Sequence, residues 1–395
     1  MVMNNLLKIN SEANSQDKTK NTKSSSQKDD LLVVEKDNNW KNDDDDLEIV
    51  FGGYSNGAKL FAINLDGSDV EGFPILLDEK MLKGVALADF NGNGKDDIVV
   101  GTDDDNIYLI YDDGMVGFTF TAGDKIRSAP IIIDNGIEKI IVVGSKDDNL
   151  YAINGSGELH FQFNCSDDIY TSPTVLTTPT GSMIFFGDDS GNVYALDLNG
   201  NLKEGYPISV YDQDLLLEFD SIIGSIVFED IDLDGYAEII FGDGGGDLHI
   251  LKTSDNTYSN FYYYNSMPMS NTFSYSSSLN IQDIDQDGDL EIFGGTTGDV
   301  KIIDIKESSQ SSDYWNIYRG NYHRNGLFIS ELMCTPGDIN NDGVLNILDI
   351  VSIVNIIIDS PELTDLETCA ADINFDGVID ILDVVTLVNT VISEN

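Results

Sequence analysis

The sequence predicts a mainly β fold, a β-propeller, followed by a small all-α domain. A unit of two β runs joined by a polar turn recurs six times before residue 330. Glycine is frequent, at 36 of 395 residues, which is typical of chains with many tight turns. After residue 330 the spacing of apolar residues changes from about 2 towards about 3.6, the helical period, so a separate domain begins there.

Composition narrows the range of partners. The chain has 70 acidic and 21 basic side chains, a formal charge of −49, and would be repelled by nucleic acids and anionic membranes. No apolar run reaches the roughly 20 residues of a membrane span. The longest candidate, Ile347 to Ile358, is interrupted by Asp349 and Asn355. We therefore expect no nucleic-acid partner and no membrane span.

Residues 1–30 are rich in Lys, Asn, Ser, Gln and Asp and contain no aromatic residue. A segment of this composition cannot bury enough apolar surface to offset the conformational entropy lost on ordering, so we expect a disordered leader. The predicted propeller covers residues 31–330 and the predicted C-terminal domain covers 334–395. The first residues lack the apolar core of a secretory signal. Either the protein is not exported by that route, or the sequence is part of a longer protein, which is the interpretation we favour.

The propeller prediction depends on a regular repeat. Each copy holds an apolar run, a glycine, a short polar turn and an alternating run, as in KIIVVGSKDDNLYAIN. The glycines are 49, 43, 43, 55 and 52 residues apart, a period that suits a four-stranded blade. They are Gly52, Gly101, Gly144, Gly187, Gly242 and Gly294.

Two further short runs, Ser128–Ile133 and Leu159–Phe163, flank the third hairpin and bring the unit to about four strands. We predict six blades and leave a seventh open, because closure of a ring removes exposed edges. The alternative is an array of β-sandwiches, which the similar repeat lengths disfavour. Leu31–Glu35 is expected to supply the first strand of blade 1, and Tyr314–Phe328 to end the last blade.

Three blades carry oxygen-bearing residues at alternate positions between the first and second strands, followed by a β run. The first series is Asp89, Asn91, Asn93, the carbonyl of Lys95, and Asp97. The second is Asp230, Asp232, Asp234, the carbonyl of Tyr236, and Glu238. The third is Asp283, Asp285, Asp287, the carbonyl of Asp289, and Glu291.

In all three series the sixth position is glycine: Gly94, Gly235 and Gly288. The loops resemble FG-GAP or VCBS repeats, known from integrin α-chain propellers and secreted bacterial proteins. That resemblance implies calcium bound for rigidity. IIIDNGIEK and LTTPTGSM lack such a series, and NWKNDDDDLE, with Asp45 where glycine is expected, fits only loosely.

The C-terminal domain contains two copies of a calcium-loop pattern, 34 residues apart. Oxygen ligands at positions 1, 3, 5, 7, 9 and 12 suit calcium rather than zinc or copper. The first loop offers Asp338, Asn340, Asp342, the Val344 carbonyl, Asn346 and Asp349. The second offers Asp372, Asn374, Asp376, the Val378 carbonyl, Asp380 and Asp383. With the three blade loops, we expect about five calcium ions.

Each C-terminal loop is followed by a helical pattern, and the segment resembles a type I dockerin, an EF-hand-like module that docks on a cohesin domain. The resemblance implies an extracellular or cell-surface protein attached to a scaffold. It assigns partner choice to loop positions 10 and 11, here Ile347, Leu348, Ile381 and Leu382. These apolar pairs depart from the best-known cellulosomal members, so another cohesin type or an intramolecular partner stays open.

Cys334 and Cys369 precede the two loops by four and three residues. Because the duplication would bring the two loop entrances together, we predict a disulfide, with two unpaired thiols as the alternative.

Catalytic motifs are absent from the sequence. His160, His249 and His323 fall in different repeats without a nucleophile motif, and we expect them to be ordinary surface or strand residues. A pair of glycosidase carboxylates is compatible with so many acids, but none can be nominated. Quinone-dependent propeller dehydrogenases are similar to this chain only in blade shape. With only 2 Trp, the chain lacks their repeated tryptophan docking pattern. Tyr262, Tyr263, Tyr264 and Trp315 suit either sugar stacking or blade packing.

We therefore predict a non-catalytic extracellular protein whose propeller binds a protein or glycan. The alternatives are a polysaccharide-degrading glycoside hydrolase, an accessory subunit of a cellulosome-like complex, or the C-terminal fragment of a larger secreted enzyme.

Overall fold

The computed structural model describes most of residues 48–393. The described ranges are 48–54, 57–77, 79–136, 138–178, 181–209, 221–253, 269–270, 273–308, 314–330, 337–340, 345–359, 370–371, 373 and 379–393. The predicted leader, the strand at Leu31–Glu35, the pair Cys334 and Cys369, and Tyr262–Tyr264 lie outside them.

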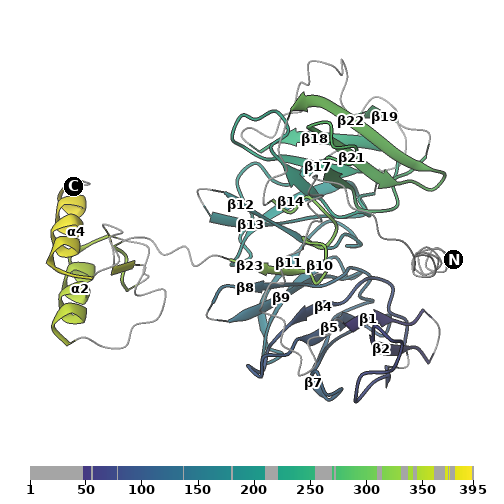
Figure 1. Ribbon diagram of the computed structural model, residues 1–395, viewed down its shortest axis with the longest axis horizontal. Coiled ribbons are helices and arrows are strands. Elements are labelled where there is room, and N and C mark those ends of the chain that lie inside the picture. The colour runs from purple at the N-terminus through teal and green to yellow at the C-terminus, as the bar shows by residue number, and fades with distance from the viewer. Residues whose placement is uncertain are drawn as a thin grey trace, which may run out of the picture. The chain divides into compact units, whose positions relative to one another are not determined.

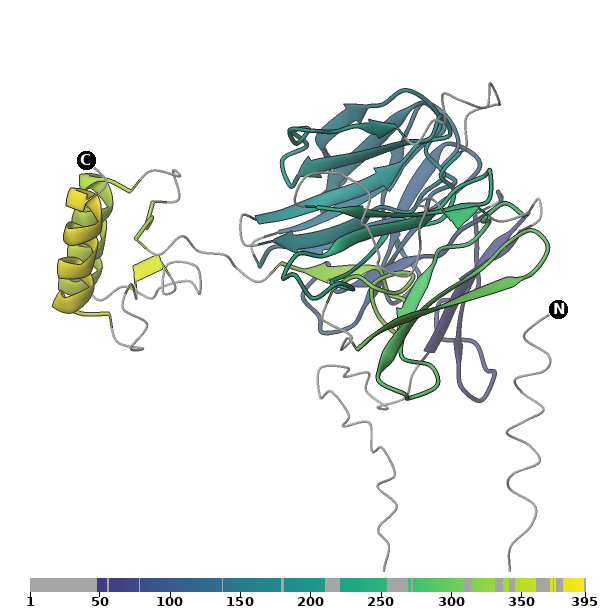
Figure 2. The same cartoon turned by 90° about the horizontal axis from the view of Figure 1, so that it is seen from above.

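Six sheets follow one another along the described chain, and we number them blades 1 to 6 (Figures 1 and 2). Blades 1 and 2 contain β1 (Glu48–Gly52), β2 (Lys59–Asn64) and β3 (Ile75–Leu76), then β4 (Ala86–Ala88), β5 (Asp97–Gly101), β6 (Asn106–Ile110) and β7 (Val116–Thr121). Blades 3 and 4 contain β8 (Ile131–Asp134), β9 (Lys139–Gly144), β10 (Asn149–Asn154) and β11 (Leu159–Asn164), then β12 (Thr174–Thr178), β13 (Gly181–Gly187), β14 (Asn192–Asp197) and β15 (Ile208–Ser209).

Blades 5 and 6 contain β16 (Val227–Glu229), β17 (Glu238–Gly242), β18 (Asp247–Lys252) and β19 (Met269–Ser270), then β20 (Asn280–Gln282), β21 (Asp289–Gly295) and β22 (Val300–Ser308). Consecutive strands within every blade pair antiparallel, as the hairpin pattern predicted. The predicted mainly β propeller with six blades is confirmed for the described residues.

The repeated glycines have a packing role. Four of them end the second strand of a blade, and Gly52 ends β1, the first described strand of blade 1. A Cβ atom at any of these five would lie 2.1–2.7 Å from a large side chain that leads into the next blade. The facing pairs are Gly52 with Met81, Gly101 with Ile126, Gly144 with Ile169, Gly187 with Ile222, and Gly242 with Tyr275. The glycine period is therefore the blade period, because each blade needs a position without a side chain to admit its neighbour.

Apolar clusters join neighbouring blades. One joins blades 1 and 2, one blades 2 and 3, one blades 3 to 5, and one blades 5 and 6. On the first and last blades, Ile49, Phe51, Val300 and Ile302 are 41–69% exposed. Described residues therefore cover only one face of each of these two blades.

The segment that follows blade 6 differs from the prediction. Tyr314–Phe328 was expected to end the last blade, but β23 (Leu327–Ile329) pairs parallel to β8 in blade 3. Backbone carbonyls of the whole segment, not of β23 alone, accept hydrogen bonds from the first strands of blades 5, 6, 2 and 3. The donors are the N–H groups of Phe228, Ile281, Leu87 and Ile132. We call residues 314–329 the crossing segment. It leaves blade 6 because its Trp315, only 6% exposed, joins the core of blades 3 to 5.

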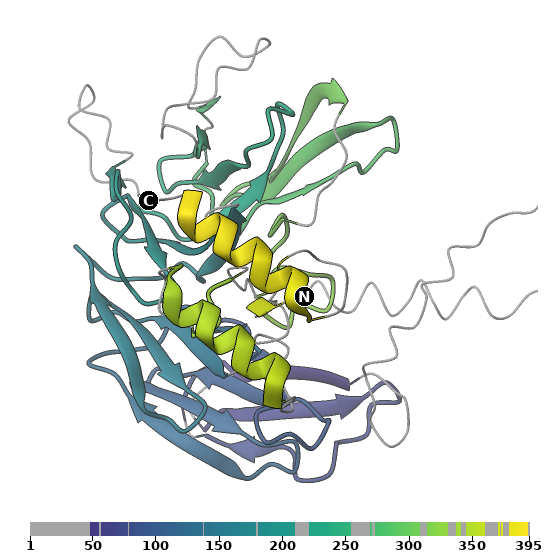
Figure 3. The same cartoon turned by 90° about the vertical axis from the view of Figure 1, so that its left-hand side faces the viewer.

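Two helices of the C-terminal domain are described over their full length, α2 (Ile347–Asp359) and α4 (Ile381–Ser393). The helices lie side by side (Figure 3). Ile353, Val384 and Leu387 form its core with Ala371. None of the described helices is long and apolar enough to pass through a bilayer.

Candidate metal centres

The three propeller loops share one geometry. They lie between β4 and β5, β16 and β17, and β20 and β21, where the sequence predicted them. In each loop the first carboxylate accepts the N–H of the glycine at position 6, at 2.7 Å for Asp89, 2.9 Å for Asp230 and 3.2 Å for Asp283. The side chains of Asn93, Asp234 and Asp287 accept the N–H of position 7, which is Lys95, Tyr236 or Asp289. These bonds curl the loop around its own oxygen atoms.

Two positions of every loop have left-handed backbone. The glycines at position 6 have φ of 85–97°, and position 4 is left-handed as well, with φ of 57° at Leu233 and 61° at Gln286. Gly92 holds that position in blade 2. A left-handed leucine is unfavourable on steric grounds and persists only where the surrounding contacts enforce it. The repeated conformation therefore indicates a selected loop shape rather than an acidic turn of arbitrary form.

The carboxylate at position 9 is buried in all three loops. Asp97, Glu238 and Glu291 are at most 4% exposed, and each accepts the N–H of position 2, donated by Phe90, Ile231 or Ile284. Burial raises the pKa of Asp97 to about 6 and that of Glu238 to about 8. A carboxylate in such surroundings favours a bound cation or a proton over a bare charge.

Blades 5 and 6 also contain carboxylate oxygens that no described group satisfies. Within the described part of the chain, Oε1 of Glu238, Oε1 of Glu291 and Oδ1 of Asp283 are buried without a hydrogen-bond partner. Ligand atoms of Asp283, Asp285 and Glu291 lie within 4.8 Å of one another, as do those of Asp230, Asp232 and Asp234. Hard oxygen donors gathered in this way fit calcium.

The blade 2 loop is more fully hydrogen-bonded. Oδ1 of Asp97 accepts the N–H of Asp112 at 3.1 Å and the amide of Asn91 at 3.3 Å. Asp112 lies just after β6 and outside the predicted series, and it also accepts the amide of Asn93 at 2.8 Å. This residue was missed because it joins the loop only through the fold of the hairpin.

In the C-terminal loops, the carboxylates at position 12 tie each loop to its helix. Asp349 and Asp383 are fully buried in the first turns of α2 and α4. Asp349 accepts the N–H groups of Ile339 and Asn346, at 3.0 and 2.9 Å. Asp383 accepts those of Ile373 and Asp380, both at 2.9 Å. Asp338 is buried, whereas Asn340 is exposed.

Six predicted C-terminal ligands lie outside the described residues: Asp342, Val344, Asp372, Asn374, Asp376 and Val378. The ninth loop positions are described and serve as helix caps. Asn346 and Asp380 each accept an N–H of the following helix, from Leu348 and Leu382, at 2.7 Å. A capping side chain at position 9 is compatible with a calcium contact through water.

Apolar pairs at the start of both helices are exposed. Ile347 and Leu348 are 69% and 58% exposed, and Ile381 and Leu382 are 63% and 55% exposed. Val351 and Val385, one turn further along each helix, are exposed as well. The same apolar surface therefore occurs twice, once on each helix.

One histidine, His249, makes a contact that recurs from blade to blade. Nε2 of His249 lies 2.7 Å from Asp243, and both side chains are 1% exposed. Tyrosines take the same place in three other blades, where Tyr108, Tyr151 and Tyr194 bond Asp104, Asp147 and Asp188. The pair of His249 and Asp243 is thus a repeated strand-to-turn contact. His160 and His323 are exposed.

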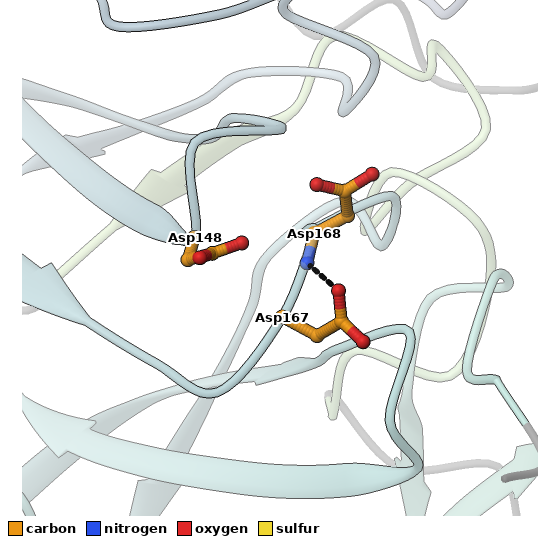
Figure 4. A group of neighbouring side chains, drawn as sticks. All are labelled: Asp148, Asp167 and Asp168. Carbon is orange, nitrogen blue, oxygen red and sulfur yellow. Dashed lines mark hydrogen bonds between the residues drawn. The ribbon is translucent and has the colours of Figure 1, made fainter.

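A further acidic group, Asp148, Asp167 and Asp168, was not predicted (Figure 4). Two of its three carboxylates already have protein partners. Asp167 accepts the N–H of Asp168 at 2.9 Å and the hydroxyl of Ser190 at 2.7 Å, and Asp168 pairs with Lys146. The arrangement is therefore explained without an ion.

Comparison with known proteins divides the chain into two matched parts. Residues 336–392 match the family model of the dockerin type I domain, and residues 49–175 match that of the lambda-carrageenase beta-propeller domain. The predicted dockerin and propeller are therefore supported. The FG-GAP or VCBS type was not matched and stays a prediction.

A search of curated proteins found no match. Similar solved structures include BamB from Moraxella catarrhalis, at 13% identity and a TM-score of 0.45 over 67% of this chain and 73% of that chain. Another is BBS1N in complex with ARL6DN, soaked with lead, at 12% identity and a TM-score of 0.44 over 67% of this chain and 76% of that chain. Scores this low carry no argument about function.

Proposed function

We propose that this chain is a non-catalytic, extracellular calcium-binding protein. Its propeller binds a protein or glycan ligand, and its C-terminal domain attaches it to a cohesin-type partner. The observation that carries the proposal is the duplicated loop and helix at residues 338–393, with an equivalent apolar pair exposed at the start of each helix. The dockerin match supports the partner class and, through it, a place outside the cell.

Calcium would hold both parts in shape. In the C-terminal loops, Asp349 and Asp383 tie each loop to its helix, and binding of the ion there would be coupled to folding. In the propeller, the ion would neutralise carboxylates that are buried at position 9. We assign the ion a structural role in both parts.

Calcium removal tests this role. Both named helices of the described residues, α2 and α4, lie in the C-terminal domain, so unfolding of that domain would remove their helical signal in circular dichroism. We expect EDTA to abolish that signal and excess calcium to restore it, with magnesium a poor substitute because it requires a tighter octahedral shell. An unchanged spectrum in chelator would contradict the proposal.

Partner binding tests the attachment role. We expect the full chain to bind a member of a panel of cohesin domains in calcium. Because the two apolar pairs are equivalent, Ile347→Ser with Leu348→Ser, or Ile381→Ser with Leu382→Ser, should weaken binding, and the four changes together should abolish it. The matched control is Tyr322→Ser, which removes an exposed apolar side chain from the propeller. Equal binding by the fourfold variant and the control would count against the proposed surface.

A second candidate function has one specific observation in its favour. The match of residues 49–175 to a lambda-carrageenase propeller domain makes a polysaccharide-active enzyme, or an accessory subunit of one, the alternative. Release of reducing ends from a panel of neutral and sulfated polysaccharides would establish that alternative. Binding to a polysaccharide without release of reducing ends would support the non-catalytic proposal.

A further inference from the structure

Each propeller loop meets one residue that lies outside the loop. After position 9 the chain forms a hairpin, and a residue on or just after its returning strand bonds position 9 or lies opposite it in the register. That residue is Asp112 in blade 2, Lys252 in blade 5 and Asp304 in blade 6, at 15, 14 and 13 positions after Asp97, Glu238 and Glu291. We call it the returning residue.

In blade 5 the returning residue is a cation. Lys252 lies directly opposite Glu238 in the strand register, and its ammonium group pairs with both Asp232 and Asp234. Lys252 therefore neutralises the ligands at loop positions 3 and 5 without a metal ion.

In blade 6 the returning residue is an acid. Asp304 lies directly opposite Glu291, which is 4% exposed. Like charges at opposite positions of a strand pair repel each other. Oε1 of Glu291 and Oδ1 of Asp283 are also buried without a hydrogen-bond partner among the described residues. A divalent cation between the loop and the returning strand would satisfy these oxygens and remove the repulsion.

Blade 2 has an acidic returning residue as well. Asp112 bonds Asn93 at 2.8 Å, and its other oxygen lies 3.8 Å from Lys95, whose side chain is 39% exposed. Lys95 belongs to the loop and offers only its carbonyl to the predicted ligand set. In contrast to blade 5, no described ammonium group bonds the carboxylates of the blade 2 series.

We propose that the returning residue decides which propeller loops hold calcium. Asp304 strengthens the blade 6 site by placing a further carboxylate opposite Glu291. In blade 5, Lys252 competes with the ion for Asp232 and Asp234 and so weakens that site. An incoming calcium ion would have to displace the ammonium group from Asp232 and Asp234. This inference rests on the proposed calcium binding, and it lowers the number of tightly bound ions in the whole chain from five to four.

The test is calorimetric titration of the metal-stripped full chain with calcium. Lys252→Gln should gain one tight ion, with an affinity at blade 5 roughly 10- to 100-fold above that of the wild type. Lys252→Arg keeps the cation and should behave as the wild type. Lys301→Gln is the matched control, because Lys301 pairs with Asp299 outside the loops. Adding Asp230→Asn to Lys252→Gln should remove the gained ion and so assign it to blade 5.

Asp304→Asn should weaken the blade 6 site by roughly 10- to 100-fold, whereas Asp299→Asn, on the same hairpin, should leave it unchanged. Thermal melting in excess calcium would show that each variant is folded. The inference is overturned if Asp230→Asn removes a tight ion from the wild type while Lys252→Gln changes nothing, or if Asp304→Asn binds as the wild type does. If Asp89→Asn, Asp230→Asn and Asp283→Asn each bound as many ions as the wild type, calcium binding by the propeller itself would be overturned.

Discussion

The thiol of Cys165 shows how burial changes the acidity of a side chain in this protein. Its Sγ atom lies 3.2 Å from the carbonyl oxygen of Asp148 and 3.1 Å from that of Asp167. Burial raises the pKa of this thiol to about 12, and the acids around it act in the same direction. The folded state therefore holds the thiol proton, and this contribution to stability is complete below the pKa of the unfolded thiol and lost as the pH rises through about 12.

Cys165 should resist alkylation in the folded protein. At pH 8.5 about half of the unfolded thiol is ionised, whereas the folded thiol stays protonated. We expect iodoacetamide to label Cys165 roughly 100-fold more slowly, or slower still, in calcium-loaded protein than in protein unfolded with urea. Peptide mass spectrometry separates Cys165 from the other two cysteines. Similar labelling rates in the two states would show that the thiol is not protected.

The glycines that admit the next blade can be tested one pair at a time. A Cβ atom on Gly144 would lie 2.2 Å from Cγ2 of Ile169, so Gly144→Ala should lower the free energy of unfolding by about 1–3 kcal/mol. Ile169→Ala should cost about 2–5 kcal/mol by leaving a cavity. Because the cavity relieves the clash, the double variant should cost less than the sum. Urea unfolding in calcium measures all three, and strict additivity would contradict direct packing of the pair.

At the scale of elements, hairpins and turns were predictable, and the crossing segment was not. Strand pairs such as β9 with β10 follow from alternation and a short turn, which are local properties. The segment at 314–329 has no such local signal, because it is stabilised by strands up to 234 positions away, as in the bond from Arg319 to the Val85 carbonyl. Its interpretation as the end of the last blade was wrong for that reason.

The crossing segment should be essential to stability. Trp315→Ala removes a buried side chain from the core of blades 3 to 5 and should lower the free energy of unfolding by about 3–5 kcal/mol. Tyr322→Ala, in the same segment but 77% exposed, should change it by less than about 0.5 kcal/mol. Chemical denaturation followed by fluorescence compares the two, and a similar loss for both would refute the difference in burial.

For the whole molecule, charge is the dominant property. A formal charge of −49 destabilises any compact state through self-repulsion, and bound calcium or added salt reduces that repulsion. The same acidic residues include the proposed calcium ligands. Stability should therefore depend on ionic conditions more than it does for a neutral propeller.

Salt should stabilise the metal-free chain more than the calcium-loaded chain. Raising sodium chloride from about 0.05 to about 0.5 M shortens the screening length several-fold and should raise the melting temperature in EDTA by several degrees. In excess calcium the rise should be smaller, because part of the charge is already neutralised. Calorimetric scans with potassium chloride as a second salt would separate screening from an ion-specific effect. Equal shifts with and without calcium would contradict the argument.

The amino-acid sequence by itself determined six repeats, the place of each loop that carries the predicted calcium ligands, and the two helical segments α2 and α4. These features depend on residues within about a dozen positions of each other, where alternation, left-handed turns and helix caps act locally. Only the tertiary structure decided which side chain returns to each loop and where residues 314–329 run. Lys252 and Asp304 meet their loops through strand register, and Trp315 meets its core across blades. Such contacts follow from the packing of the whole chain, which no local pattern encodes.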